Sequence, residues 1–250
     1  MEADNIIANT YKTSQVAQII GIHPNTVRLY EELGLIPKPE RQENGYRVFT
    51  DIHIEQFRLA RTALKVEVLQ NGLRKQAIDI IKTSATGNLI EAENLAKGYL
   101  RQIKREQRNA EEAIEIVMQL LSAEEQETDK LRLTRKETAD YLQITMDTLR
   151  NWELNGLVTV KRKQNGYRVY TDEDIKRLKI IRSLRCANYS LSAILRMLNE
   201  LSRDPLADIE EAIDTPKETD DIISVCDKLL TSLRRAEENA EDMLVLLRNC

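Results

Sequence analysis

The residues best suited to chemistry in this 250-residue chain are two arginines, Arg28 and Arg150, each of which follows a threonine by two positions, Thr26 and Thr148. A guanidinium group is a planar fork of donors that fits a phosphate or the acceptor edge of guanine. A threonine hydroxyl near the start of a helix can contact the phosphate backbone. Residues of these types can therefore contact a phosphate or a base edge if a helix presents them together.

Two Asn-Gly dipeptides each precede a strand-like run, YRVFT or YRVYT. This combination is typical of a tight β-hairpin. Arginines flank both turns, and a basic hairpin beside a groove-binding helix can follow the DNA backbone. Any one of these arginines could equally be a solvated surface residue, but their repetition at matched offsets favours a shared binding role. The flanking arginines are Arg41, Arg47, Arg162 and Arg168.

Both patterns belong to one internal repeat. The segment 16–51 recurs as 138–172, with one residue fewer before the second Asn-Gly. A match of this length is implausible as coincidence, and the repeat is too long and occurs too few times for a solenoid. We therefore expect two copies of one small domain.

The first copy contains the local signals of a helix-turn-helix. An amphipathic helix is predicted near 14–20, and Gly21 permits a tight turn after it. Pro24 is favourable at the first position of a second helix, and Gly34 stands where a left-handed C-cap belongs. A helix fits the major groove of B-DNA, so each copy is expected to be a helix-turn-helix followed by a wing.

Composition limits the other function classes. Charged residues make up 31% of the chain, and glycine, proline and aromatic residues are scarce, which favours long amphipathic helices. No apolar run approaches the roughly 18 to 20 residues of a membrane span, and the N-terminus lacks a signal-peptide pattern, so we expect a cytoplasmic location without membrane contact. The chain contains no phosphate loop, His-Glu-x-x-His or nucleophile elbow, so we expect neither enzyme activity nor a cofactor.

The three cysteines are widely separated and form no Cys-x-x-Cys pair, so a metal site is not expected. The net charge of −4 argues mildly against nucleic acid, but the charge is segregated. Between residues 132 and 185, thirteen Lys or Arg stand against seven Asp or Glu, whereas 203–221 holds eight acids and two bases. We expect this acidic stretch to be a solvated connector; the alternative is that it folds back on a basic head.

A heptad pattern follows each copy and predicts a coiled-coil seam. The second seam alternates spacings of four and three without interruption, whereas the first is weaker at Glu106 and rich in alanine. The first seam is Leu89, Ala92, Ala96, Tyr99, Ile103, Glu106, Ala110, Ala113, Val117 and Leu120. The second is Ile222, Cys226, Leu229, Leu233, Ala236, Ala240, Met243 and Leu247.

The two copies resemble the MerR family of transcription regulators, whose DNA-binding domain carries an R-x-Y-E-x-x-G-L pattern followed by a G-Y-R-x-Y wing. The first copy reads RLYEELGL and then GYRVF, and the second reads RNWELNGL and then GYRVY. In that family the recognition-helix arginine, the arginine four residues before the wing glycine and the wing Tyr-Arg pair typically contact DNA. The resemblance implies these roles for Arg28, Arg41, Tyr46 and Arg47, and for Arg150, Arg162, Tyr167 and Arg168.

The chain departs from the family pattern in several places. Such regulators usually carry one reading head and dimerise through an antiparallel long helix, whereas this chain has two heads. Trp152 replaces tyrosine, and we expect it to be buried rather than to stack on a base. Gln143 stands in the place of Gly21. Cys226 occupies a seam position, where packing is favoured over metal sensing because metal-sensing relatives have clustered cysteines.

The predicted fold is mainly α, with two winged helix-turn-helix domains and two long helices that form an antiparallel coiled coil. We expect the winged domains at 10–82 and 131–202 and the coiled-coil helices at 88–122 and 219–250. Pairing within one chain, as a pseudo-dimer, is favoured because tethering gives a high effective concentration. A homodimer that pairs like with like is the alternative.

These features predict a sequence-specific DNA-binding transcription regulator whose two unlike heads grip and distort one promoter or operator, with RNA polymerase at the promoter as a candidate partner. Because the heads differ, the operator is expected to be non-palindromic. The alternative is an architectural, partition or excisionase-like DNA-binding protein that does not regulate a promoter. A coiled-coil scaffold with drifted heads is a third class, disfavoured because both copies retain the wing arginines.

Overall fold

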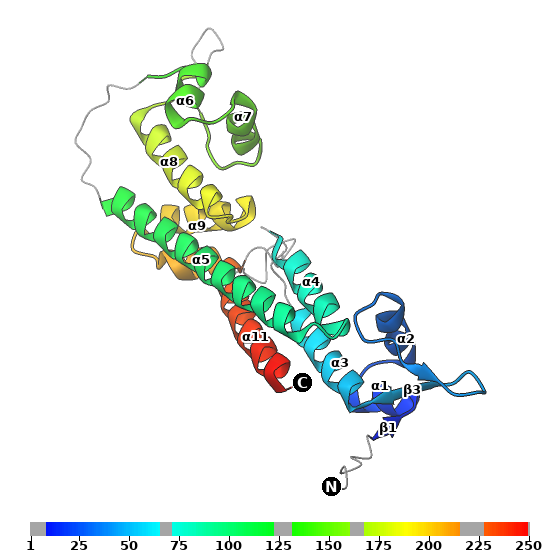
Figure 1. Ribbon diagram of the computed structural model, residues 1–250. Coiled ribbons are helices and arrows are strands. Elements are labelled where there is room, and N and C mark those ends of the chain that lie inside the picture. Colours follow the sequence, from blue (N-terminus) through cyan, green and yellow to red (C-terminus); the bar gives the residue numbers. More distant parts are fainter. Residues whose placement is uncertain (1–8, 66–71, 123–131, 161–167, 216–227, 250) are drawn as a thin grey trace. The chain divides into compact units, whose positions relative to one another are not determined.

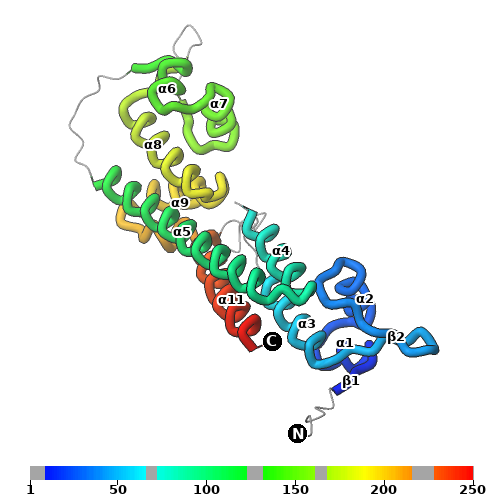
Figure 2. Tube along the Cα trace, in the orientation of Figure 1, coloured from blue at the N-terminus to red at the C-terminus, as the bar shows by residue number. Residues whose placement is uncertain are grey.

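The computed structural model describes residues 9–65, 72–122, 132–160, 168–215 and 228–249, and these are mainly helical (Figure 1). The chain divides into two compact units, of which the first combines 1–104 with 233–250 and the second comprises 105–232. The two longest of the described helices are α5 (Leu89–Ser122) and α11 (Leu229–Asn249), which Figure 2 traces in green and red. Each contributes residues to both units. No helix among the described residues is long and apolar enough to cross a membrane.

The predicted helix-turn-helix is present in the first unit. It consists of α1 (Thr13–Ile20) and α2 (Pro24–Glu32), joined through Gly21 at φ +70°. His23 caps α2, because its Nδ1 accepts a hydrogen bond of 3.2 Å from the backbone N–H of Asn25. Pro24 therefore occupies the first helical position, as predicted.

Three short strands form the wing and its attachment. They are β1 (Thr10–Tyr11), β2 (Glu40–Arg41) and β3 (Arg47–Thr50), and they make an antiparallel sheet in the order β1-β3-β2. In the wing, Arg41 lies opposite Arg47. The sequence therefore located the first hairpin correctly, and the turn of the second predicted hairpin, at 161–167, lies outside the described residues.

The turn of the wing is a three-residue loop, 43–45. The backbone N–H of Gln42 donates to the carbonyl of Tyr46 at 2.9 Å, and the N–H of Gly45 donates back to the carbonyl of Gln42 at 2.8 Å. Gly45 holds φ +81°, the left-handed conformation that a loop of this length requires. The Asn-Gly pair thus marks the turn, although the loop is one residue longer than the tightest hairpin.

Two further helices, α3 (Asp51–Ala63) and α4 (Leu73–Ala85), complete the first head. Gln56 is buried between them, and its Nε2 donates to the carbonyls of Leu35 at 3.0 Å and Ile81 at 2.9 Å. Its Oε1 accepts from Ser84 Oγ at 2.8 Å. This satisfied network ties the chain that leaves α2 to the helices behind it. The core of the head includes Val16, Val27, Phe49, Phe57 and Ile80.

The second unit repeats this arrangement with α6 (Arg135–Leu142), α7 (Met146–Leu154) and α8 (Asp172–Cys186). An antiparallel bridge joins Leu133 to Tyr170, the positions that correspond to the paired Tyr11 and Phe49 of the first head. At the position of Gln56, Arg177 Nε donates to the carbonyl of Leu157 at 2.6 Å. The contact that holds the end of the second helix is thus kept with a different side chain.

The long helices run antiparallel within the first unit. Arg248 Nε lies 2.9 Å from Glu93 Oε1, and Lys104 Nζ lies 3.0 Å from Glu237 Oε1. The start of α5 therefore faces the end of α11, and the middle of α5 faces an earlier turn of α11. These contacts lie within one chain.

The heptad seams coincide with the buried faces of these helices. On α5, the seam residues are buried except Leu89, Glu106 and Leu120, which are half-buried. On α11, all described seam residues are buried, and Ile222 and Cys226 lie outside the described residues. The buried residues of the second seam are Leu229, Leu233, Ala236, Ala240, Met243 and Leu247.

The expectation that 203–221 is a solvated connector was wrong for its central part. The helix α10 (Ile209–Asp214) follows α9 (Leu191–Arg203), and it buries Ile209 and Ile213 on one face. Arg196 of α9 donates to the carbonyl of Ile213 at 2.7 Å. The two isoleucines, four residues apart, were the sequence signal for this short helix, and the count of acidic residues concealed it.

Asp214, one of those acids, is buried and caps α11. Its carboxylate accepts from the backbone N–H groups of Leu230 at 2.9 Å and Thr231 at 3.0 Å, and from the Thr231 hydroxyl at 2.6 Å. A carboxylate at a helix N-terminus satisfies free N–H groups and interacts favourably with the helix dipole. Asp214 therefore fixes the residue at which the described part of α11 begins.

Gln143 ends α6 at φ +52°, in the left-handed region that Gly21 occupies in the first head. A side chain in this conformation costs of the order of 1 kcal/mol. We predict that Gln143→Gly raises the free energy of unfolding by about 0.5 to 1 kcal/mol, measured by urea denaturation. The matched control, Gly21→Gln, should lower it by about 1 kcal/mol, since no atom within 4 Å would obstruct its Cβ and only backbone strain is added. Destabilisation by Gln143→Gly would contradict this assignment.

Candidate nucleic-acid interface

The second helix of each head has a buried face and a solvent face. On α2, Val27 and Tyr30 are buried, Thr26 is half-buried and Arg28 is exposed, with its Nη1 3.3 Å from the side-chain oxygen of Asn25. Both predicted contact residues of this helix are therefore accessible to a ligand.

The helix α7 has the same arrangement. Leu149 and Trp152 are buried, Arg150 is exposed, and Thr148 is half-buried beside the N-cap residue Thr145. The two threonine hydroxyls lie 2.8 Å apart. The expected burial of Trp152 is confirmed, so its indole is not available to stack on a base.

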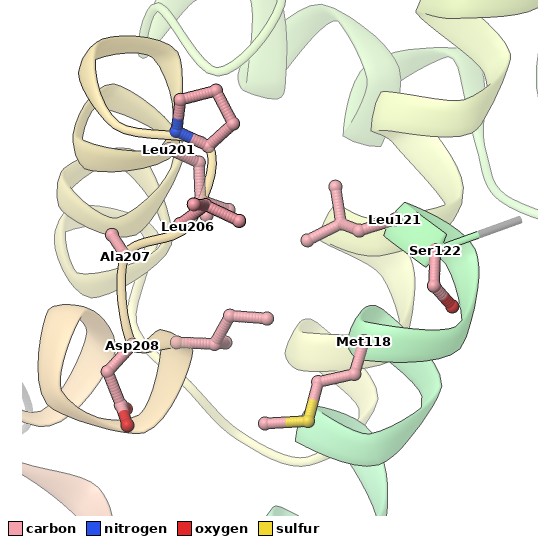
Figure 3. Close-up of a pocket in the computed structure, with 9 residues that line it drawn as sticks. Met118, Leu121, Ser122, Leu201, Leu206, Ala207 and Asp208 are labelled. Carbon is pink, nitrogen blue, oxygen red and sulfur yellow. The ribbon is translucent and has the colours of Figure 1, made fainter.

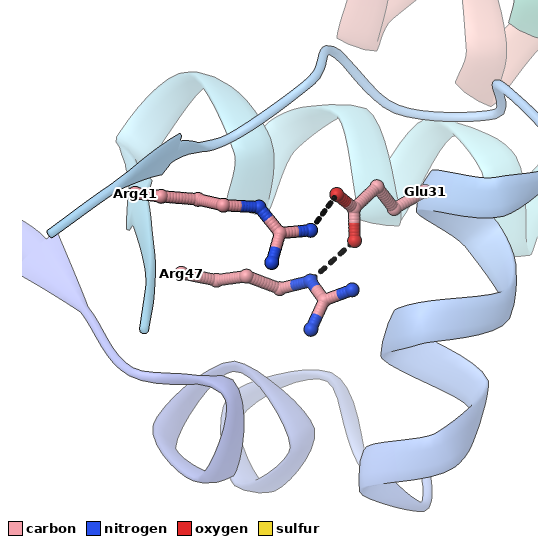
Figure 4. A network of polar contacts seen from close by, with 3 residues as sticks. All are labelled: Glu31, Arg41 and Arg47. Carbon is pink, nitrogen blue, oxygen red and sulfur yellow. Dashed lines mark hydrogen bonds and ion pairs between the residues drawn. The ribbon is translucent and has the colours of Figure 1, made fainter. Parts of the chain in front are cut away.

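A carboxylate on α2 holds the wing of the first head. Arg41 Nη2 lies 3.2 Å from Glu31 Oε1, and Arg47 Nε donates to Glu31 Oε2 (Figure 4). The side chain of Glu31 is only 10% exposed, whereas that of Arg41 is 47% exposed. Glu31 therefore anchors both strands of the wing, and the outer arginine remains accessible to solvent.

The equivalent carboxylate in the second head, Glu153, has a different set of partners. Arg168 Nε lies 3.0 Å from its Oε2, and both Arg135 and the hydroxyl of Tyr170 donate to it. Burial, together with the hydrogen bond to Glu153, raises the pKa of Tyr170 to about 12. Thr13 and Phe49 occupy the corresponding positions of the first head, so these two additional donors belong to the second head alone.

These anchors gather the predicted contact residues. Because residues three apart are neighbours on a helix, Arg28 lies beside Glu31, one turn earlier on α2, and Arg150 lies in the same way beside Glu153. In the first head, the exposed Arg28 and the two wing arginines thus lie around Glu31, whereas in the second head only Arg150 and Arg168 can be placed around Glu153, because 161–167 lie outside the described residues. Such a cluster can present guanidinium groups to a phosphate backbone while the helix enters a groove.

Of the remaining predicted contact residues, the structure describes only some. Tyr46, at the wing turn, is 71% exposed, and its backbone N–H donates to the side chain of Asn44 at 3.1 Å. Arg162 and Tyr167 lie outside the described residues. The anchoring role of the two glutamates was missed by the sequence interpretation, although both stand at matched positions of the repeat.

Comparison with known protein families gives a match for each of the two heads. Residues 12–49 match a family model described as "MerR family regulatory protein". Residues 133–201 match a second model, described as "MerR HTH family regulatory protein". Each head is therefore similar to the helix-turn-helix domain of MerR-family regulators. The predicted family resemblance is therefore confirmed for both MerR-type heads.

Individual relatives match over a short stretch. The HTH-type transcriptional regulator CueR of Escherichia coli O6:H1 is 45% identical over 53 residues, which cover 21% of this chain and 39% of that protein. The mercuric resistance operon regulatory protein of Bacillus cereus is 31% identical over 65 residues, or 26% of this chain and 49% of that protein. The matched region thus spans less than half the length of these relatives. No solved structure gives a significant match.

The second unit also contains a hollow. It has a volume of about 420 Å³ and lies between the end of α5 and the segment that joins α9 to α10 (Figure 3). Its lining is mostly apolar, and the carboxylate of Asp208 at its edge caps α10 by accepting from the N–H of Glu211 at 2.9 Å. Within the described residues, no group of three His, Cys, Asp or Glu could hold a metal ion.

Replacing Glu31 by glutamine should loosen the wing of the first head, because both wing arginines lose their ionic partner. We predict that amide exchange at Gln42, whose N–H closes the hairpin, becomes about two to five times faster, as expected for the loss of an ion pair at a partly exposed site. Hydrogen exchange followed by NMR measures this. Glu43→Gln, at the exposed wing tip, removes the same charge and should leave the rate unchanged; equal rates in both variants would show that Glu31 does not anchor the wing.

Proposed function

We propose that this protein is a sequence-specific DNA-binding transcription regulator whose two MerR-type heads bind and distort one promoter or operator. The observation that carries the proposal is the presence, in one chain, of two modules that match MerR-family models and that each combine an exposed helical arginine with a glutamate paired to an arginine of the wing sequence. The relatives named above are themselves described as regulators, which supports the same role.

In this proposal the second head takes the place of a second subunit. The buried seams of α5 and α11 and their ion pairs support an antiparallel coiled coil closed within one chain. A chain that satisfies its own seam has no need of a homodimer to present two heads. RNA polymerase at the promoter is the proposed protein partner of the bound complex.

Binding by two heads also provides energy to deform DNA. Bending or untwisting a site by tens of degrees costs on the order of several kcal/mol. Each phosphate contact contributes favourable counterion release, so two heads with several arginines each can offset this cost. Because the heads differ in sequence, the proposed operator is non-palindromic.

The direct test is selection of binding sequences from a random DNA library with the purified full chain. The proposal predicts two unlike half-sites at a fixed spacing. A palindromic motif would instead indicate a homodimer led by one head, and the absence of any enriched motif would favour an architectural or partition-like role without sequence readout.

The helical arginines should act on separate half-sites. We predict that Arg28→Ala and Arg150→Ala each weaken binding to the selected DNA about tenfold, as expected for loss of one specific or phosphate contact. In footprints, each variant should lose protection at one half-site and keep it at the other. Arg101→Ala, an equal charge loss at an exposed position of α5, is the control and should change neither. Loss at both half-sites in each variant would contradict separate reading by the two heads.

A further inference from the structure

The two recognition helices both bury apolar residues and both carry an arginine and a glutamate at matched positions, but they differ on the side that faces solvent. At 100° per residue, Leu29 lies 200° from the buried Val27 and 100° from the buried Tyr30, and so falls outside the face that meets the core of the head. It is 47% exposed. The corresponding residue of α7 is Asn151, which is exposed and stands in the same relation to the buried Leu149.

The next position on the solvent side, Leu33 in the first head and Asn155 in the second, also differs in polarity. Leu33 follows Leu29 by four positions and is 52% exposed, so the first head presents an apolar strip to solvent. In the second head these positions are Asn151 and Asn155, and Asn155 Nδ2 donates to the Asn151 side chain and, at 2.8 Å, to its carbonyl. The second head thus presents a polar strip, in which Asn155 orients the carboxamide of Asn151.

One turn earlier, the same side carries Asn25 in the first head and Asp147 in the second, both exposed. Between the heads, therefore, these outward positions change from leucine to asparagine and from asparagine to an acid. The residues suited to phosphate, Thr26 with Thr148 and Arg28 with Arg150, do not change. The constant set fits the uniform DNA backbone, and the variable set lies where base edges would be met.

We propose that Leu29 gives the first head its base preference by contacting the C5-methyl group of thymine, and that Asp147 and Asn151 give the second head a preference for a base with an exocyclic amino group. The major groove displays the thymine methyl as its apolar feature, and the amino groups of adenine and cytosine as its donors. A carboxylate or a carboxamide oxygen accepts from such a donor, whereas a leucine side chain cannot. This inference rests on the proposed function, because it assumes that both recognition helices meet DNA.

Uracil provides a clean test, since it differs from thymine only by the missing methyl group. The probes are fluorescent duplexes of the sequence selected from the random library, with thymines replaced by uracil in one half-site at a time. The half-sites are assigned by the footprints of the two arginine variants. Affinity is measured for the full chain and for Leu29→Asn, which substitutes the residue of the second head at an exposed position.

We expect uracil in the first half-site to weaken binding of the native chain about three- to fivefold, the effect of one buried methyl-sized group. Uracil in the second half-site should have no effect. Leu29→Asn should lose the sensitivity to uracil, and Asn151→Leu should gain it in the second half-site. Circular dichroism spectra of the variants should match that of the native chain, because both positions are exposed.

Two outcomes would overturn the inference while leaving the proposed function intact. One is selected DNA that binds equally well with thymine or uracil in both half-sites. The other is an equal uracil effect in the native chain and in Leu29→Asn, which would place the methyl contact elsewhere and leave the Leu29–Leu33 strip for a protein partner. Failure of the proposed function is distinguishable, because the library would then yield no enriched sequence.

Discussion

The burial of one apolar face on each of the long helices α5 and α11 is the constraint from which the organisation of this chain follows. The seam residues of α5 and α11 are too apolar to remain in water, and alanines at several positions permit close approach of the helices. In the first unit, Arg248 with Glu93 and Lys104 with Glu237 fix the antiparallel direction. Exposed ion pairs of this kind contribute little stability, so burial of the seam supplies the energy and the charges set direction and register.

Carboxylates position further parts of the structure, namely the start of α11 and the arginines beside the second helix of each head. Asp214 closes the N-terminus of α11, Glu31 holds the wing of the first head against α2, and Glu153 pairs with Arg168 in the second head. In each case a short acidic side chain, well packed, satisfies donors that would otherwise be left without partners. These three acids therefore serve internal order, and the net charge of −4 is compatible with exposed guanidinium groups at the heads.

Much of the fold was predictable because it depends on local chemistry. Proline and glycine punctuate the helix-turn-helix, Asn-Gly marks the wing, and the heptad spacing identifies the buried faces of both long helices. The glutamate anchors were not predicted, since a buried ion pair requires knowledge of which strand lies beside which helix. The helix α10 was missed because its two buried isoleucines lie among acids whose role, in the case of Asp214, is to cap a helix distant in sequence.

The mass of the free chain in solution tests the central claim most directly. Light scattering or sedimentation at low micromolar concentration should give the mass of one chain, 28.8 kDa, if the seams close within the chain. A mass of twice that value, unchanged on further dilution, would show that the long helices pair between chains, and the account of a single-chain regulator with two heads would then be contradicted.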